Sequence, residues 1–204
     1  MSLKAGNLCD LLEKLPSIRS NHHVLAQLLR HILEALDYLA FRGWCHRDVK
    51  PDNILYTPSG DNSCLFQLAD FGFVNQQRFA NTFCGSLPYM APEMVYGNHP
   101  QSPKLDVWSL FVVIGVVMQA GGLGDPKLAS YEEVLTRVRA AATQHSTLSP
   151  MAQENPELRA SAAQMLAKCF DGHGLSTPRN QVSPIPDPVR SNHRPQNHAN
   201  SSRS

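Results

Sequence analysis

Apolar residues at helical spacing predict two amphipathic helices at the start of the chain. In the first, Leu8, Leu11, Leu12 and Leu15 lie on one face, and Pro16 ends the helix. The second runs from about residue 21 to residue 42, where Gly43 provides a natural stop. Its apolar stripe consists of Leu25, Leu28, Leu29, Ile32, Leu33, Leu36 and Leu39. Each helix therefore has one face to bury.

Two short β-type runs and three further helices follow. Residues 54–56 and 64–68 favour strands, and the turn-rich stretch 57–62 between them predicts a hairpin. Residues 105–118 are apolar on nearly all sides, which is typical of a buried helix. Two amphipathic helices are indicated by Tyr131, Val134, Leu135 and Val138 and by Leu158, Ala162, Met165, Leu166 and Cys169. The predicted fold is mainly α, within the α+β class: a helical bundle with short β-hairpins.

The composition changes after about residue 171. From there to Ser204 the chain is rich in Pro, Ser, Asn, Arg and His and has few large apolar side chains. Such a segment cannot offset its ordering entropy by burial. We therefore expect one domain over residues 1–170 and a disordered tail over residues 171–204.

Charge and hydropathy narrow the function classes. The 204 residues carry a formal net charge of +1, which gives no reason to expect nucleic acid or an anionic membrane as a partner. The start of the chain does not read as a signal segment, and the apolar run 110–118 is too short to cross a bilayer. These observations lead us to expect a cytoplasmic or nuclear protein.

The cysteines favour free thiols over a disulfide framework. They are odd in number and scattered: Cys9, Cys45, Cys64, Cys84 and Cys169. A zinc site built from Cys45, Cys64, Cys84 and His46 is the sharper alternative, but the chain has no pair of cysteines separated by two residues.

Three motifs in fixed order carry the chemistry. Residues 46–53 read HRDVKPDN, residues 70–72 read DFG and residues 91–93 read APE. Together they resemble the catalytic loop, metal-binding turn and end of the activation segment of eukaryotic protein kinases. The resemblance covers residues 1 to about 170, is weaker after about residue 120, and implies a kinase C-terminal lobe. Small-molecule phosphotransferases of kinase-like fold fit less well, because they lack Lys50-Pro51 and the APE motif.

The resemblance implies a catalytic role for three loop residues. Asp48 would accept the proton of the substrate hydroxyl, Lys50 would reach the transferring phosphate, and Asn53 would hold Mg²⁺. Lys50 followed by proline resembles serine/threonine kinases. Asp70 would share the metal and so contact ATP, whereas Asn7 and Leu55 would contact its ribose and adenine.

Control and structural roles also follow from the resemblance. Arg47 would pair with a phosphate on the activation segment, for which Thr82 is the candidate acceptor, and Ser86 would hydrogen-bond the catalytic loop.

Four further residues would have structural roles. His46 and Phe71 would stack on each other, and Asp106 would anchor the catalytic-loop backbone. Glu93 would pair with a buried arginine near the last helices. The candidate considered is Arg179, whose surroundings fit the family pattern poorly.

Several parts of a complete kinase have no counterpart upstream of His46. The first 45 residues contain no glycine-rich loop, no strand lysine and no helix glutamate to pair with it, and Lys4 is too close to Leu8 to be that lysine. We therefore expect an absent N-terminal lobe, a mobile Asp70, weak nucleotide binding and a bare apolar upper face.

Two hypotheses remain open at this stage. One is a serine/threonine kinase domain, incomplete in this chain, which uses ATP and Mg²⁺ on a protein substrate and is activated by an upstream kinase at Thr82. The other is a non-catalytic one-lobed module that binds a partner through its upper face. Substitution of Asp48 by alanine would abolish the biological effect in the first case and leave it unchanged in the second.

Overall fold

The computed structural model describes residues 4–60, 63–73, 75–76, 87–125, 127 and 130–187. Its helices are α1 (Leu8–Lys14), α2 (His22–Phe41), α3 (Pro92–Tyr96), α4 (Lys104–Met118), α5 (Tyr131–Gln144) and α6 (Ala162–Phe170). Its strands are β1 (Gly6–Asn7), β2 (Trp44–Cys45), β3 (Ile54–Pro58), β4 (Cys64–Leu68) and β5 (Asn75–Gln76). The predicted mainly α fold is confirmed.

The helices begin and end where local chemistry predicts. Asn7 and Asp10 form a reciprocal capping box at the start of α1. Asn21 caps α2 by accepting hydrogen bonds from the backbone N–H groups of His23 and Val24. The predicted helix over residues 21–42 agrees with the observed bounds to within one residue at each end.

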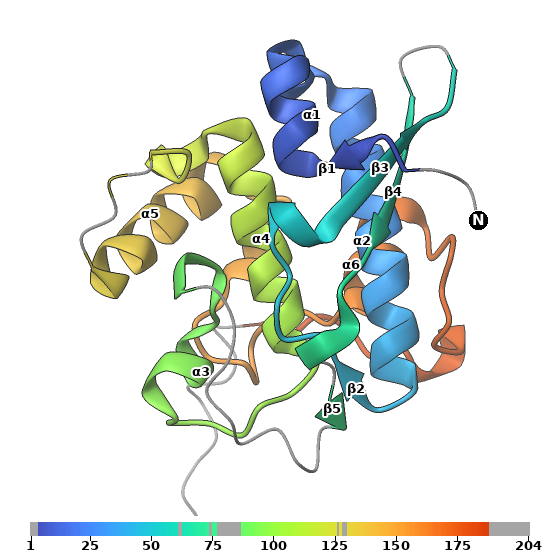
Figure 1. The fold of residues 1–204 in the computed structure, drawn as a ribbon. Helices are drawn as coiled ribbons and strands as arrows, with labels where there is room; N and C mark the ends of the chain where they lie inside the picture. Colours follow the sequence, from blue (N-terminus) through green and yellow to red (C-terminus); the bar gives the residue numbers. More distant parts are fainter. Residues whose placement is uncertain are drawn as a thin grey trace, which may run out of the picture.

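The main sheet has the strand order β1-β3-β4, with both pairs antiparallel. The predicted hairpin is therefore present, and β1 adds a strand that the apolar pattern did not indicate. Two side chains of α2 bind the backbone of β4. Gln27 accepts a hydrogen bond from the N–H of Cys64 at 2.9 Å, and His31 accepts one from the N–H of Phe66 at 3.3 Å. A second pair, β2 and β5, lies at the opposite end of the fold from α1 (Figure 1).

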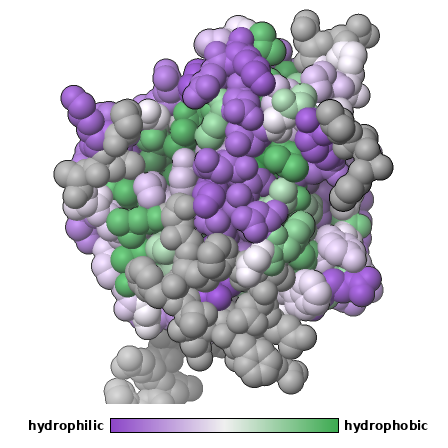
Figure 2. All heavy atoms as spheres, in the orientation of Figure 1, coloured by the Kyte–Doolittle hydropathy of each residue, from purple (hydrophilic) through white to green (hydrophobic). Residues whose placement is uncertain are grey.

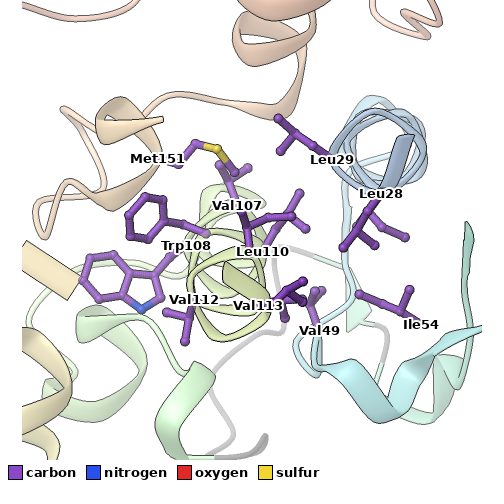
Figure 3. Packing of buried hydrophobic residues seen from close by; sticks show 14 of the residues in the cluster. Leu28, Leu29, Val49, Ile54, Val107, Trp108, Leu110, Val112, Val113 and Met151 are labelled. Atoms are coloured by element: carbon purple, nitrogen blue, oxygen red, sulfur yellow. The ribbon is translucent and has the colours of Figure 1, made fainter. Parts of the chain in front are cut away.

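Helix α4 is the centre of the core. It packs against α2 on one side and α5 on another (Figure 1). All but three of its fifteen residues are buried, as expected for a helix without a polar face. Figure 3 shows Val49, from the loop between β2 and β3, and Ile54, at the start of β3, directed toward α4, with Met151 approaching from the other side.

The packed structure continues beyond the expected boundary at residue 170. Residues 171–187, which we call the C-terminal strap, run from the end of α6 along α2 and α6. Leu175 and Ile185 pack against the core, and buried polar groups of α2 and α6 bind the strap backbone. Sparse apolar residues are sufficient here because hydrogen bonds supply much of the attachment.

The surface mixes polar and apolar groups. In Figure 2 hydrophilic residues dominate the centre of the visible face, with smaller apolar areas on either side. The described residues include eight large apolar side chains that are exposed: Leu15, Tyr38, Phe41, Trp44, Leu65, Phe71, Leu87 and Tyr96. Among the described helices, none combines the length and apolar composition needed to cross a membrane.

Candidate active site

One buried carboxylate holds the loop that carries the HRD sequence. Asp106, in the first turn of α4, accepts hydrogen bonds from the backbone N–H groups of His46 and Arg47, both at 2.7 Å. Burial raises the pKa of Asp106 to about 7, against the opposing effect of these two N–H donors. The loop backbone is thereby fixed to the central helix, in the arrangement expected from the sequence.

Arg47 has an uncommon backbone conformation. Its φ is +71°, in the left-handed region that side-chain-bearing residues rarely adopt. The residue is 4% exposed, and its guanidinium donates a hydrogen bond to the side-chain oxygen of Gln101 at 3.0 Å. Together with the N–H bond to Asp106, this contact holds a backbone shape that is otherwise unfavourable.

The three proposed catalytic side chains meet at one oxygen atom. Asp48 Oδ2 accepts hydrogen bonds from Lys50 Nζ at 2.7 Å and from Asn53 Nδ2 at 2.9 Å. Asn53 Nδ2 also donates to the backbone carbonyl of Asp48 at 2.8 Å. These bonds use the amide nitrogen of Asn53, so its Oδ1 points away from Asp48. The carboxylate is therefore oriented from two sides.

His46 connects this loop to the DFG turn. Its Nε2 lies 3.0 Å from the carbonyl oxygen of Ala69, and its ring meets that of Phe71 edge to face with 5.3 Å between centroids. The expected contact between the two rings is present. Burial lowers the pKa of His46, which favours the neutral ring.

The DFG turn itself is open to solvent. Asp70 is exposed and has a φ of +60°, and one of its carboxylate oxygens accepts a hydrogen bond from the N–H of Gly72 at 3.2 Å. Phe71 is 54% exposed. The neighbouring loop and this turn thus share an unusual backbone conformation but differ in burial.

The two residues expected at the nucleotide base and ribose lie opposite each other. Asn7 in β1 pairs with Leu55 in β3, and both are partly buried. The side-chain oxygen of Asn7 accepts a hydrogen bond from the N–H of Asp10, so that oxygen is committed to capping α1. The sequence did not reveal this second role of Asn7.

Glu93 forms a buried ion pair whose partner is Arg159 and not Arg179. The two terminal nitrogens of the Arg159 guanidinium lie 2.7 and 2.9 Å from the carboxylate oxygens of Glu93, and both side chains are fully buried. The ring of Trp108 lies under the guanidinium at 5.1 Å. Arg159 also donates to three backbone carbonyls, those of Lys104, Gln153 and Glu154.

One local signal in the sequence could have identified Arg159 as the partner of Glu93. Arg179 instead pairs with Asp171 at the surface. Ser161 and Gln164 have the spacing of a capping box, and the structure confirms that they begin α6. A helix start at this point puts Arg159 at the entrance of the last helix, where the buried arginine was expected.

Part of the predicted site lies outside the described residues. Thr82 and Ser86 belong to this part, as does Cys84 of the zinc alternative. Within the described ranges, three or more His, Cys, Asp or Glu side chains do not gather at one point as a metal site of that kind would need. Cys9, Cys45, Cys64 and Cys169 are free thiols.

The comparison with protein families agrees with this geometry. A model described as protein kinase domain matches residues 2–173, and the chain therefore belongs to the protein kinase family. The family resemblance stated from the motifs is confirmed. The absence of an N-terminal lobe stays a prediction.

The curated relatives are all named as kinases, and several are named as serine/threonine-protein kinases. Sperm motility kinase 3A of Mus musculus is 30% identical over 183 residues, which cover 82% of this chain and 35% of that protein. NUAK family SNF1-like kinase 2 of Rattus norvegicus is 37% identical over 55% of this chain and 18% of its own length. Serine/threonine-protein kinase kin-29 of Caenorhabditis elegans is 43% identical over 45% of this chain and 11% of its own. The chain thus spans about a third or less of these relatives.

Proposed function

We propose that this chain carries the catalytic loop of a protein kinase that transfers the γ-phosphate of ATP to serine or threonine hydroxyls of proteins. The observation that carries the proposal is the position of Asp48. Its carboxylate is 3% exposed, is oriented by Lys50 and Asn53, and lies on a loop fixed to α4 through Asp106.

Each residue of this loop would have a separate task. Asp48 would orient the acceptor hydroxyl and take its proton, a role that typically contributes about 10²–10⁴-fold in rate. Lys50 already lies beside Asp48, with a quarter of its side chain exposed, and its ammonium would neutralise charge on the transferring phosphate. Holding the reacting groups in line is the larger contribution in this class of reaction.

The available oxygen atoms fit a magnesium ion. Mg²⁺ prefers oxygen ligands, and Asn53 Oδ1 and the Asp70 carboxylate are oxygen donors at the two ends of this site. The hydrogen bonds of Asn53 Nδ2 leave its oxygen available for that purpose. Bound Mg²⁺ would shield the phosphate charges of ATP. Leu55 would contact the adenine and Asn7 the ribose, the latter through its amide nitrogen.

Control would act through Arg47. We expect a phosphate at Thr82, added by an upstream kinase, to bind this guanidinium, and Ser86 to hydrogen-bond Asp48 and Lys50. Gln101 holds Arg47 in place beforehand. The free thiols favour a reducing compartment, so a cytoplasmic or nuclear site of action is part of the proposal.

A second candidate function is a non-catalytic binding module. Phe71 is more than half exposed next to the catalytic loop. A partner protein that covers Phe71 and the neighbouring surface would use this exposure without any phosphoryl transfer.

The test is phosphate transfer by the protein isolated at its native length. With radiolabelled ATP and Mg²⁺, we expect label on serine and threonine peptides and none on matched tyrosine peptides. The Asp70→Asn variant should lose most of the Mg²⁺-dependent rate, whereas Asp171→Asn, a surface carboxylate beyond α6, should keep it. No transfer to any peptide would favour the binding module, and transfer to tyrosine would contradict the proposed specificity.

A further inference from the structure

Hydrogen bonds attach the C-terminal strap to the helices at two points, and each point includes a Ser or Thr that is followed by Pro. At the first, the strap residues Ser176 and Thr177 bind Asp37 of α2. At the second, Ser183 and Pro184 bind Gln164 of α6. The kinase reaction proposed above uses neither point.

The first attachment depends on one buried carboxylate. Asp37 is 1% exposed, and within the described part of the chain the three hydrogen bonds that it accepts all come from the strap. They join its oxygens to the N–H of Ser176 at 2.7 Å, the N–H of Thr177 at 2.9 Å and the hydroxyl of Thr177 at 2.6 Å. A buried negative charge is tolerated here because these three donors all form hydrogen bonds with the carboxylate.

We propose that Thr177 is a phosphorylation site and that its phosphorylation releases the strap from α2. Thr177 is half-buried and is followed by three exposed residues, Pro178, Arg179 and Asn180. A protein kinase that accepts Thr-Pro sites could therefore bind this segment when the strap opens locally. The Thr177 Oγ1 would form a bond to the γ-phosphorus of ATP, the bond from that phosphorus to ADP would break, and the hydroxyl proton would pass to the modifying kinase.

Phosphorylation would replace the hydroxyl donor of Thr177 by a negatively charged phosphate next to the Asp37 carboxylate. Phosphothreonine carries about −1.5 to −2 charges at neutral pH, and the oxygen that bears it lies against the Asp37 carboxylate. Glu34 of α2, which is paired with Arg30 at 3.6 Å, also approaches the strap at Gly174. Two cations could oppose release: Arg179, paired with Asp171, and Lys104, which lines a cavity with Thr177.

The second attachment provides a matched comparison, because Ser183 faces a donor. Gln164 Nε2 donates to the carbonyls of Ser183 and Pro184 at 3.0 and 2.8 Å and lies 3.3 Å from the Ser183 hydroxyl. Ser183 is exposed, so a negative charge there can face water and an amide N–H together. Release should therefore depend on where the charge is added and not merely on its presence in the strap.

Release would also open a cavity. A space of about 650 Å³ lies between the end of α2, the start of α6 and the strap, and its lining includes Phe41, Ala163 and Thr177. Phosphorylation of Thr177 would thus expose apolar surface of α2 and α6 that the strap covers in this structure.

Amide hydrogen exchange in the full chain tests the release step. In the Thr177→Glu variant, we expect the amides of residues 176 and 177 to exchange about ten- to a hundredfold faster than in the wild type. Thr177→Val and Ser183→Glu should keep most of the protection, and α4 amides report whether each variant is folded. The double variant Asp37→Asn/Thr177→Glu should regain protection, because the facing charge is gone.

Two results would overturn the proposal. Unchanged protection in Thr177→Glu would show that Arg179 or Lys104 accommodates the charge. Phosphopeptide analysis of the protein from its source cells tests the modification itself: phosphate on Thr177 is expected, and its absence across growth and stress conditions would contradict the site. If Thr177→Glu fails to fold, the double variant and the phosphorylated wild-type chain still decide the outcome.

Discussion

The catalytic loop and the DFG turn each contain a residue in the left-handed backbone conformation, but the two residues differ in burial and in their contacts. Arg47 and Asp70 both have positive φ values, +71° and +60°, although neither is a glycine. Arg47 is buried, and its N–H is bound by Asp106. Asp70 is exposed, and the described contact of its carboxylate is the N–H of Gly72.

This difference separates a fixed part of the site from an adjustable one. The loop around Asp48 is attached to the core by the buried carboxylate of Asp106, so its geometry is set by the fold of this chain. Among the described residues, the turn around Asp70 is held by the bond from the Gly72 N–H to Asp70, by the contact of His46 with the Ala69 carbonyl and by the contact between the His46 and Phe71 rings. We infer that Asp48, the proposed base, is preorganised and that Asp70, the proposed metal ligand, takes its final position when ligands bind.

The largest expected effect comes from breaking the buried ion pair next to the start of α4, the helix that holds the fixed part. Replacing Arg159 by Met leaves Glu93 as an unpaired buried charge, which typically costs about 3–5 kcal/mol. Urea denaturation should show this loss, whereas Arg179→Met, which removes an exposed pair, should cost less than about 1 kcal/mol. Equal losses in the two variants would contradict the structural role assigned to Arg159.

The next effect concerns the anchor of the loop. Asp106→Asn replaces one carboxylate oxygen by an NH₂ group that faces a backbone N–H, and we expect a loss of about 2–3 kcal/mol. Thermal unfolding measures it, with Glu13→Gln on the surface as the control. A loss no greater than that of the control would mean that Asp106 does not hold the loop.

A smaller effect is the pH dependence of the stability contributed by His46, which joins the catalytic loop to the DFG turn. Because burial lowers the pKa of His46 in the folded chain, the unfolded chain binds a proton first as the pH falls below about 6.5. The contribution of His46 is therefore complete above that pH and decreases toward its lower folded pKa, by at most about 1.4 kcal/mol per pH unit.

The comparison that isolates this effect is with His46→Gln. Glutamine can still donate to the carbonyl of Ala69 but does not titrate. The wild type should lose stability relative to this variant between pH 6.5 and 5, and a difference that stays constant over this range would contradict the assignment. Asp106, whose pKa is raised to about 7, acts in the opposite direction but equally in both proteins.

The smallest effect tests the difference between the two residues with positive φ, Asp70 and Arg47. Asp70→Gly relieves the left-handed conformation while making the unfolded chain more flexible, so stability should change by less than about 0.5 kcal/mol. Arg47→Gly has the same backbone benefit but loses a buried side chain and its bond to Gln101, and should cost more than about 1 kcal/mol. Similar results for the two variants would remove the distinction between the two regions.

Local patterns predicted most of the fold because they are read within a few residues. The stripe of leucines gave α2, the continuous apolar run gave α4, and the turn residues gave the β3–β4 hairpin. The motifs also identified the residues that meet around Asp48, since these lie within one short loop.

Interactions distant in sequence were harder to predict. Glu93 and Arg159 are 66 residues apart, and no local pattern identifies such a pair except through the cap of α6. The strap looked too polar to be ordered, because its attachment relies on Asp37, in a helix far upstream in the sequence, and on Gln164, in the helix that directly precedes the strap. The composition of a segment indicates how much apolar surface it can bury. It does not indicate which buried polar side chains elsewhere in the fold can form hydrogen bonds with it.

The most direct test of the account is the rate of phosphate transfer at saturating ATP and peptide for two variants of one loop. Asp48→Asn removes the buried, oriented carboxylate, and Asp52→Asn removes an exposed carboxylate four residues later. We expect the first to lower the rate about 10²–10⁴-fold and the second to leave it within the same order of magnitude. Equal rates for Asp48→Asn and the wild type would contradict the assignment of Asp48 as the catalytic base.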